Sequence, residues 1–182
     1  MSALSFNALF YLASSLNEMG MKKIVILLLV GFVHFSLLAN DSVSGKVISV
    51  IDGNTLEVVT ETNESYRVIL QGIDCPEIGQ AFGEEARLHL EGIILTKEIT
   101  IEFQGKDRWG NYIAIVFVDD LDPRIDLLNR GLAWTAEKGA TAGLKDLEER
   151  ARKNYLGLWE QENPTPPWVY RRQQTMMQVK GS

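Results

Sequence analysis

Two carboxylates three residues apart, Asp74 and Glu77, are the side chains of this sequence best suited to chemistry. The run from Tyr66 to Leu70 before them is rich in β-branched and aromatic residues, which favours a strand. Gly72 permits a turn and Pro76 disfavours helical angles in the residue before it, so the pair should lie on a bent loop at the end of that strand. Carboxylates on a loop held by a rigid strand can bind a hard cation or transfer protons. The same spacing is also common among solvated loop charges, so the pair needs support from its surroundings.

The elements that must position this loop follow a mainly β pattern. The expected strands cover residues 44–51, 55–60, 65–70, 98–103 and 112–118, and the expected helices cover 82–94, 125–129 and a segment around Leu144, Leu147 and Ala151. A helix between the third and fourth strands, with further helices at the end, describes an α+β, mainly β fold. We expect a five-stranded Greek-key barrel of the OB type with about three helices.

Further motifs surround the carboxylates in a characteristic order. They are Asp-Gly-Asn-Thr at 52–55, Gly-Ile-Asp-Cys-Pro-Glu at 72–77, Gln-Ala-Phe-Gly at 80–83, Asp-Arg-Trp-Gly at 107–110, Gly-Leu-Ala-Trp at 131–134 and Gly-Leu-Trp at 157–159. Together they resemble the staphylococcal nuclease (thermonuclease) family over roughly residues 44–168. The resemblance implies the SNase-like form of the OB fold and calcium-dependent hydrolysis of phosphodiester bonds in DNA and RNA.

The resemblance also implies roles for residues of the loop. Asp74 matches a carboxylate that binds calcium, Glu77 matches the carboxylate that acts on the attacking water, and Cys75 matches a residue whose backbone carbonyl binds the metal. Asn54 stands where the family has another metal carboxylate. Its amide oxygen can still bind Ca²⁺, but the site has lost one negative charge and should bind the ion weakly.

Both arginines that neutralise the phosphate in the family are replaced in this chain. Ile69 and Asn111 occupy their positions. Arg67 lies two residues before Ile69, on the same face of the strand and displaced by about 6.6 Å along it. Arg108 lies three residues before Asn111 in the same loop. These two arginines are the candidate substitutes in the phosphate clamp.

Two functions remain open on these residues. The first is a nuclease-like domain with a degenerate site, weak or absent cleavage and a binding role, whose partner is a single-stranded nucleic acid or nucleotide, a protein or a cell-envelope component. The second is an active calcium-dependent nuclease in which Arg67 and Arg108 form the clamp. Losing one preorganised donor typically costs about 10²- to 10³-fold in rate. The combined changes at Asn54, Ile69 and Asn111 therefore favour the first function.

Net charge limits how this chain can hold a polyanion. Without residues 1–39, which contain two lysines and one glutamate, 16 basic and 23 acidic residues remain, a net charge of −7. Non-specific binding of nucleic acid depends on Lys and Arg at the phosphates, so a local basic patch would be needed. The candidate contacts to nucleic acid are Lys106, Trp109 and Tyr112, in or beside the loop expected near the site, with Arg171–Arg172 as further basic candidates.

The N-terminal part predicts an export leader. A positive start at Met21, an apolar run and small residues before Asn40 are typical of a secretory signal peptide. The mature chain is then expected to be exported to the periplasm or secreted, as a monomer without a stable membrane span; the alternative is an uncleaved N-terminal membrane anchor. The expected organisation is a non-native or untranslated leader at 1–20, a signal peptide at 21–39, the OB-fold domain at 40–168 and a mobile C-terminal tail at 169–182.

Overall fold

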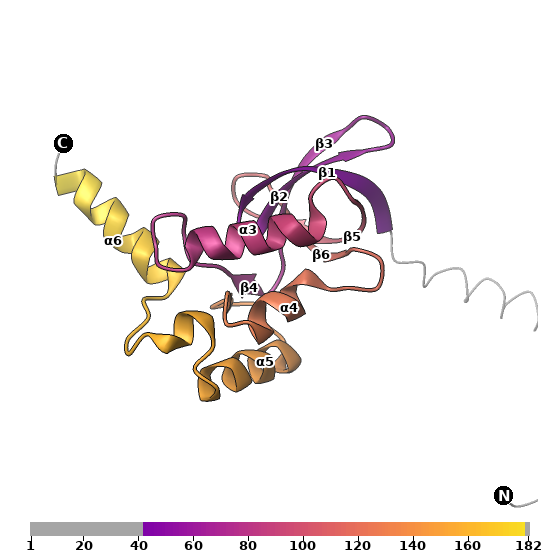
Figure 1. The fold of residues 1–182 in the computed structure, drawn as a ribbon. Coiled ribbons are helices and arrows are strands. Elements are labelled where there is room, and N and C mark those ends of the chain that lie inside the picture. Colours follow the sequence, from indigo (N-terminus) through magenta and orange to yellow (C-terminus); the bar gives the residue numbers. More distant parts are fainter. Residues whose placement is uncertain (1–41, 181–182) are drawn as a thin grey trace, which may run out of the picture. The chain divides into compact units, whose positions relative to one another are not determined.

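The computed structural model describes residues 42–180 of the chain (Figure 1). The predicted signal peptide and the segment before it lie outside the described residues. Between residues 42 and 180, no helix has both the length and the apolar character needed to cross a membrane.

Five strands form a closed barrel in the order β1-β2-β3-β6-β5. They are β1 (Ser42–Asp52), β2 (Thr55–Thr60), β3 (Ser65–Leu70), β5 (Glu98–Lys106) and β6 (Tyr112–Phe117). Neighbouring strands are antiparallel except β3 and β6, which are parallel. Strand β1 pairs with β2 on one side and β5 on the other, and irregularities in its pairing with β2 allow the bending that closure requires. The five-stranded OB-type barrel and the mainly β class predicted from the sequence are confirmed.

The barrel interior is filled by the alternate side chains of its strands. Val47, Leu56, Val68 and Ile101 are completely buried, and their neighbours in sequence face outward. Helix α3 (Gly83–Ile94) covers this interior and contributes further buried residues such as Leu90. The barrel and α3 therefore share one hydrophobic core, which gives the loops at their edge a rigid support.

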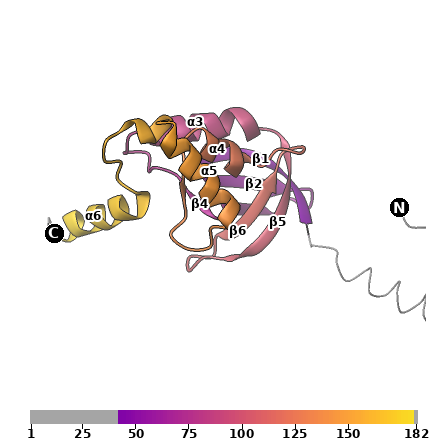
Figure 2. The same ribbon diagram turned by 90° about the horizontal axis from the view of Figure 1, so that it is seen from below.

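The remaining helices follow the barrel strands in sequence. They are α4 (Pro123–Asn129), α5 (Ala142–Lys153), a 3₁₀ turn η1 (Gly157–Glu160) and α6 (Pro167–Lys180). Side-chain oxygens of Asp122 and Thr141 cap the first turns of α4 and α5. Figure 2 shows α3, α4 and α5 together on one side of the barrel, while α6 extends away from it. The described part thus has four α-helices, one more than expected, because the predicted tail contains α6.

A second, smaller core joins the end of the chain to the barrel. Trp134 and Trp159 are nearly buried with ring centroids 4.4 Å apart, and Trp168 packs on Trp134 at 5.7 Å. Arg152 lies over both rings of the Trp134–Trp159 pair. Trp134 itself belongs to β7 (Trp134–Thr135), which pairs with the short strand β4 (Ile73–Asp74). The sequence did not predict this pair, since two-residue strands carry no periodic signal.

Candidate active site

The backbone around Asp74 is fixed from two directions. Gly72, with a φ of +81°, turns the chain out of the barrel, and β4 then pairs Asp74 with Trp134 of β7. Behind the turn, the buried Arg124 of α4 donates a hydrogen bond to the carbonyl oxygen of Gln71 at 3.1 Å. The carboxylate of Asp74 therefore projects from a segment held by the barrel and by a neighbouring helix.

The turn between β1 and β2 packs directly against this segment. The side-chain oxygen of Asn54 accepts a hydrogen bond from the backbone N–H of Cys75 at 2.9 Å. Gly53 has no room for a side chain, because a Cβ there would lie 2.5 Å from the Cβ of Cys75. The structure thus brings Asn54, Cys75 and Asp74 together, as their proposed metal roles require. However, the one oxygen that Asn54 could offer a cation already accepts a backbone hydrogen bond.

Glu77 is positioned by a tight turn at the start of α3. Its backbone N–H donates to the side-chain oxygen of Gln80 at 2.9 Å, and its carbonyl accepts from the N–H of Gln80 at 2.8 Å. A Cβ at Gly83 would lie 2.0 Å from the Glu77 carbonyl oxygen, so only glycine allows this approach. The motif at 80–83 therefore serves to hold Glu77 beside Asp74.

The two carboxylates converge on one guanidinium, that of Arg171 in α6. Its Nη1 donates to Asp74 Oδ1 at 3.0 Å and to Glu77 Oε1 at 2.6 Å, and its Nη2 donates to Asp74 Oδ2 at 2.8 Å. The hydrogen bond to Asp74, together with that to Glu77, raises the pKa of Arg171. Arg171 was expected only as a member of a basic patch. Nothing in the local sequence indicated that it would meet the carboxylates.

The arginine proposed on β3 faces a different partner. Arg67 Nη2 lies 3.3 Å from Glu57 Oε1, directly across the β2–β3 ladder, and the pair is exposed. Ile69, two residues further on the same face, is partly buried and pairs with Thr55 and Ile113 of the neighbouring strands. Arg67 is therefore held by Glu57, whereas the two site carboxylates are paired with Arg171.

The loop between β5 and β6 is organised around Asp107. Its carboxylate accepts hydrogen bonds from the backbone N–H groups of Trp109 and Asn111, both at 2.9 Å, and from the Asn111 side chain at 2.8 Å. Burial opposes ionisation of Asp107, but hydrogen bonds from Asn111 and from the loop backbone lower its pKa. Asn111, where the family has an arginine, thus stabilises the loop.

Aromatic and basic side chains are paired on this side of the barrel. The guanidinium of Arg108 lies 4.0 Å from the ring centre of Trp109, whose side chain is largely exposed. Lys106 lies 4.1 Å from the ring centre of Tyr112, and that ring packs against Phe103 at 4.6 Å. Trp109 is therefore free to stack on a base, whereas Tyr112 is partly engaged in packing.

The oxygen ligands at the site suit a hard cation, which they would bind with low affinity. Asp74 and Asn54 offer oxygen atoms, the ligand type that Ca²⁺ prefers. Burial raises the pKa of the Cys75 thiol well above its usual value, so a backbone oxygen is the only realistic ligand from that residue. Within residues 42–180, no group of three or more His, Cys, Asp or Glu side chains is arranged to hold a metal ion. The set fits the weakened cation site that the sequence predicts.

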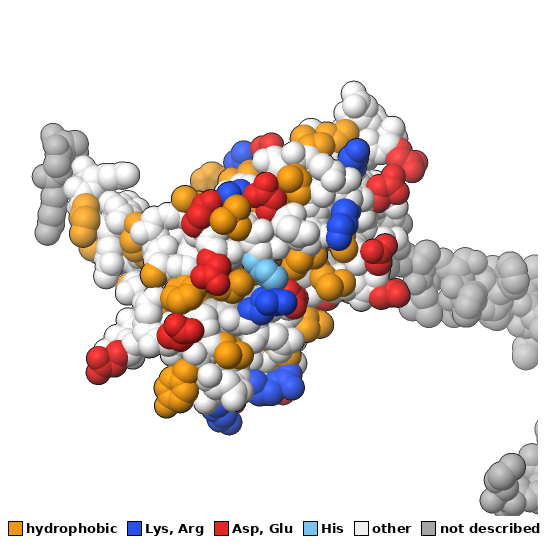
Figure 3. Space-filling view, viewed as in Figure 1, with side chains coloured by type: hydrophobic (Ala, Val, Ile, Leu, Met, Phe, Trp, Pro, Cys, Tyr) orange, Lys and Arg blue, Asp and Glu red, His pale blue; other side chains and the backbone are white. Residues whose placement is uncertain are grey.

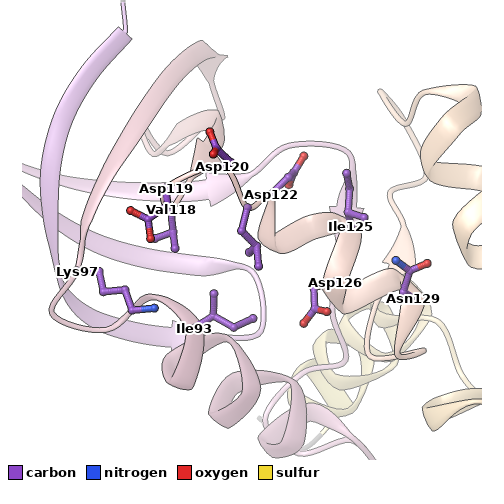
Figure 4. Close-up of a pocket in the computed structure, with 10 residues that line it drawn as sticks. Ile93, Lys97, Val118, Asp119, Asp120, Asp122, Ile125, Asp126 and Asn129 are labelled. Atoms are coloured by element: carbon purple, nitrogen blue, oxygen red, sulfur yellow. The ribbon is translucent and has the colours of Figure 1, made fainter.

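A sizeable cavity lies elsewhere and does not serve this site. It measures about 730 Å³ and opens between α3, α4 and the loop before α4 (Figure 4). Its lining includes Lys97, Asp119, Asp120, Asp122 and Asp126 but none of the residues that meet at Arg171. On the face shown in Figure 3, acidic and basic side chains are interspersed rather than gathered into one basic field. That face therefore offers a polyanion no single basic field.

Comparisons with known proteins agree on one family. Residues 67–161 match the model of the family described as staphylococcal nuclease homologue. An "Uncharacterized endonuclease" of Haemophilus influenzae is 30% identical over 148 residues, covering 81% of this chain and 83% of its own length. A "Micrococcal nuclease" of Shigella flexneri is 31% identical over 140 residues, covering 70% and 80%. A "Probable staphylococcal-like nuclease CAN2" of rice (Oryza sativa subsp. japonica) is 31% identical over 137 residues, covering 74% of this chain and 35% of that one.

Proposed function

Because the chain belongs to the staphylococcal nuclease family, we propose that it acts on phosphodiester bonds of nucleic acid through Asp74 and Glu77. The observation that carries this proposal is the convergence of both carboxylates on a single cation, the Arg171 guanidinium. Two acidic side chains from a strand end and a turn, aimed at one point on the surface, are what a phosphate-cleaving site needs.

The proposed reaction is hydrolysis by an activated water. Glu77 takes a proton from the water, whose oxygen forms a bond to phosphorus while the bond from phosphorus to the leaving sugar oxygen breaks, and that oxygen takes up a proton from solvent water. Asp74, the side-chain oxygen of Asn54 and the carbonyl of Cys75 would hold Ca²⁺, which supplies polarisation of the phosphate when bound. The hydrogen bond from the Glu77 backbone N–H to the side-chain oxygen of Gln80 holds this turn, and with it the Glu77 carboxylate, in place.

We propose that cleavage is slow and that binding is a substantial part of the role. Asn54 is neutral and its oxygen is shared with the N–H of Cys75, so Asp74 is the one anionic member of the three proposed metal ligands. Neither Ile69 nor Asn111 can neutralise charge on a phosphate, and Arg67 is paired with Glu57. The alternative, an efficient enzyme with Arg67 and Arg108 as the clamp, would require Arg67 to leave its partner.

The proposed ligand is a single-stranded nucleic acid or nucleotide. The exposed ring of Trp109, covered on one face by Arg108, offers a surface on which an unpaired base can stack. The net charge of −6 for the whole sequence argues against long electrostatic contacts along a duplex. We propose further that the segment starting at Met21 exports the chain or anchors it, and that the chain is a monomer.

The test is cleavage of single-stranded DNA and RNA by the purified chain, with and without calcium. We compare the unmodified chain with Glu77→Gln, and use Glu85→Gln as the control because Glu85 is an exposed carboxylate on the adjacent first turn of α3. We expect slow, calcium-dependent cleavage that Glu77→Gln abolishes and Glu85→Gln leaves unchanged. Cleavage that is equal in all three proteins would refute the proposed role of Glu77.

A further inference from the structure

The cation at the site comes from the last helix of the chain rather than from the barrel. Helix α6 begins at Pro167 and is fixed at its first turn by Trp168, whose ring packs on Trp134. Tyr170 approaches the loop that carries Glu77 so closely that a Cβ at Gly79 would lie 2.7 Å from its hydroxyl oxygen. Arg171 is the next residue, so its position follows from two aromatic anchors.

The guanidinium is held along one edge and open along the other. Its terminal nitrogens Nη1 and Nη2 form a fork on the two oxygens of Asp74, and Nη1 also reaches Glu77. The guanidinium has a second hydrogen-bonding edge, formed by the N–H of Nε and the remaining N–H of one terminal nitrogen. Among the described residues, no hydrogen-bond partner occupies that second edge, and the Arg171 side chain remains 49% exposed. Arg171 is thus held in place while some of its hydrogen-bond donors stay free for a ligand, unlike an arginine whose donors are all used in a structural ion pair.

From this geometry, we propose that Arg171 is the phosphate-binding arginine of the site, supplied by α6 in place of those missing at Ile69 and Asn111. The proposal rests on the proposed function and names the residue that supplies its clamp. The free edge matches two oxygens of a phosphate, the recognition for which arginine is best suited. Asp74 and Glu77 would orient this edge toward the scissile group.

The charges at the site explain why a guanidinium is needed there. Two carboxylates close together repel an approaching phosphate unless a cation lies between them. Arg171 meets both carboxylates, whereas Arg67 is occupied by Glu57 and Arg108 lies against Trp109. Among the arginines considered for the clamp, Arg171 is the one already beside the residue that acts on water.

The experiment measures kcat/KM on a 5′-phosphorylated, fluorescent single-stranded oligonucleotide in calcium for four forms of the full chain. They are the unmodified chain, Arg171→Gln, Arg171→Lys and the control Arg150→Gln, which removes the same charge from an exposed arginine of α5. Arg171→Gln should lose about 10²- to 10³-fold. Arg171→Lys, which keeps the charge without the fork, should lose less, and Arg150→Gln should match the unmodified chain. Millimolar guanidinium should partly restore the Gln variant, which a purely structural role would not allow.

The outcomes separate this inference from the proposed function. If the unmodified chain cleaves and Arg171→Gln cleaves equally or faster, Arg171 is a counter-ion that shields the carboxylates, and the inference fails while the function stands. If no form cleaves, the proposed function fails as catalysis, and binding of the same oligonucleotide is followed by fluorescence anisotropy. Loss of binding in Arg171→Gln but not in Arg150→Gln then supports the inference, and absent or equal binding overturns it.

Discussion

Asn54 differs from the aspartate of the family in a single side-chain group. The difference removes a charge from the candidate site but keeps a hydrogen bond that its backbone needs. Its side-chain oxygen accepts the hydrogen bond from Cys75 N–H that joins the β1–β2 turn to the carboxylate loop. An aspartate could accept the same hydrogen bond and would add a negative charge. The sequence predicted the weaker cation site from this residue type, and the structure adds that the same oxygen also serves as a structural acceptor.

Asn54→Asp is therefore expected to tighten calcium binding by roughly tenfold or more, because a unit charge within a few ångströms of the ion is worth more than 1.4 kcal/mol near a protein surface. Isothermal titration calorimetry with Ca²⁺ measures the change. The matched control is Asn63→Asp, in the β2–β3 turn away from Asp74 and Cys75. Equal affinities for all three proteins would show that Asn54 lies outside the cation site.

His89 and Asp126 tie α3 to α4. His89 Nε2 lies 2.5 Å from Asp126 Oδ2, and Arg130 Nε donates to the same oxygen at 3.1 Å. Burial opposes ionisation of Asp126, but the hydrogen bonds from His89 and Arg130 outweigh it and lower the pKa. Because its pKa is lowered, ionised Asp126 stabilises the folded chain at pH values above the ordinary pKa range of carboxyl groups. This stabilisation is lost as pH falls through the lowered pKa.

We predict that His89→Ala raises the pKa of Asp126 toward its ordinary value of 3.8. NMR titration of the Asp126 carboxyl carbon in both proteins measures the shift directly. The variant should also lose less stability than the unmodified chain when pH is lowered through the acid range. An unchanged Asp126 pKa in the variant would mean that Arg130 alone sets it.

At the scale of elements, the start of α3 holds the position of Glu77. Gly83→Ala would place a Cβ 2.0 Å from the Glu77 carbonyl, whereas Gly92 in the same helix has no atom within 4 Å of such a Cβ. We expect Gly83→Ala to cost about 1–3 kcal/mol of unfolding free energy and to reduce cleavage by moving Glu77. Gly92→Ala should instead stabilise the chain by up to about 1 kcal/mol. Urea denaturation of both variants tests the contrast, and equal effects would contradict it.

Helix α6 is predicted to act through its aromatic anchor. Trp168→Ala removes the contact with Trp134, so α6 should no longer hold Arg171 against Asp74. We expect a loss of kcat/KM similar to that of Arg171→Gln, with the barrel's urea midpoint little changed because α6 contributes little to the main core. Normal cleavage by Trp168→Ala would show that Arg171 is positioned without this anchor.

The elements differ in how well the sequence could indicate them. Strands β2 and β3 have the predicted bounds because their alternating residues end at polar turns. The β4–β7 pair was missed because it is short and its partners are far apart in sequence. The contact of Arg171 with Asp74 spans 97 residues and depends on how α6 docks on the tryptophan cluster. Local patterns carry no information on such docking.

For the whole molecule, the order of the motifs was enough to predict the barrel and the family. The roles of Asp74 and Glu77 on the loops beside the barrel stay predictions. The cation that meets them comes from a different part of the chain. With a net charge of −6, the molecule must rely on this local arrangement to approach a phosphate.

The most direct measurement of the central claim is single-turnover cleavage of a single-stranded oligonucleotide in calcium by the unmodified chain and by Glu77→Gln. The account predicts slow cleavage by the unmodified chain and a loss of about 10²-fold or more in the variant, the usual contribution of a positioned base. The same rate in both proteins would contradict the claim that the Asp74–Glu77 loop performs nuclease chemistry.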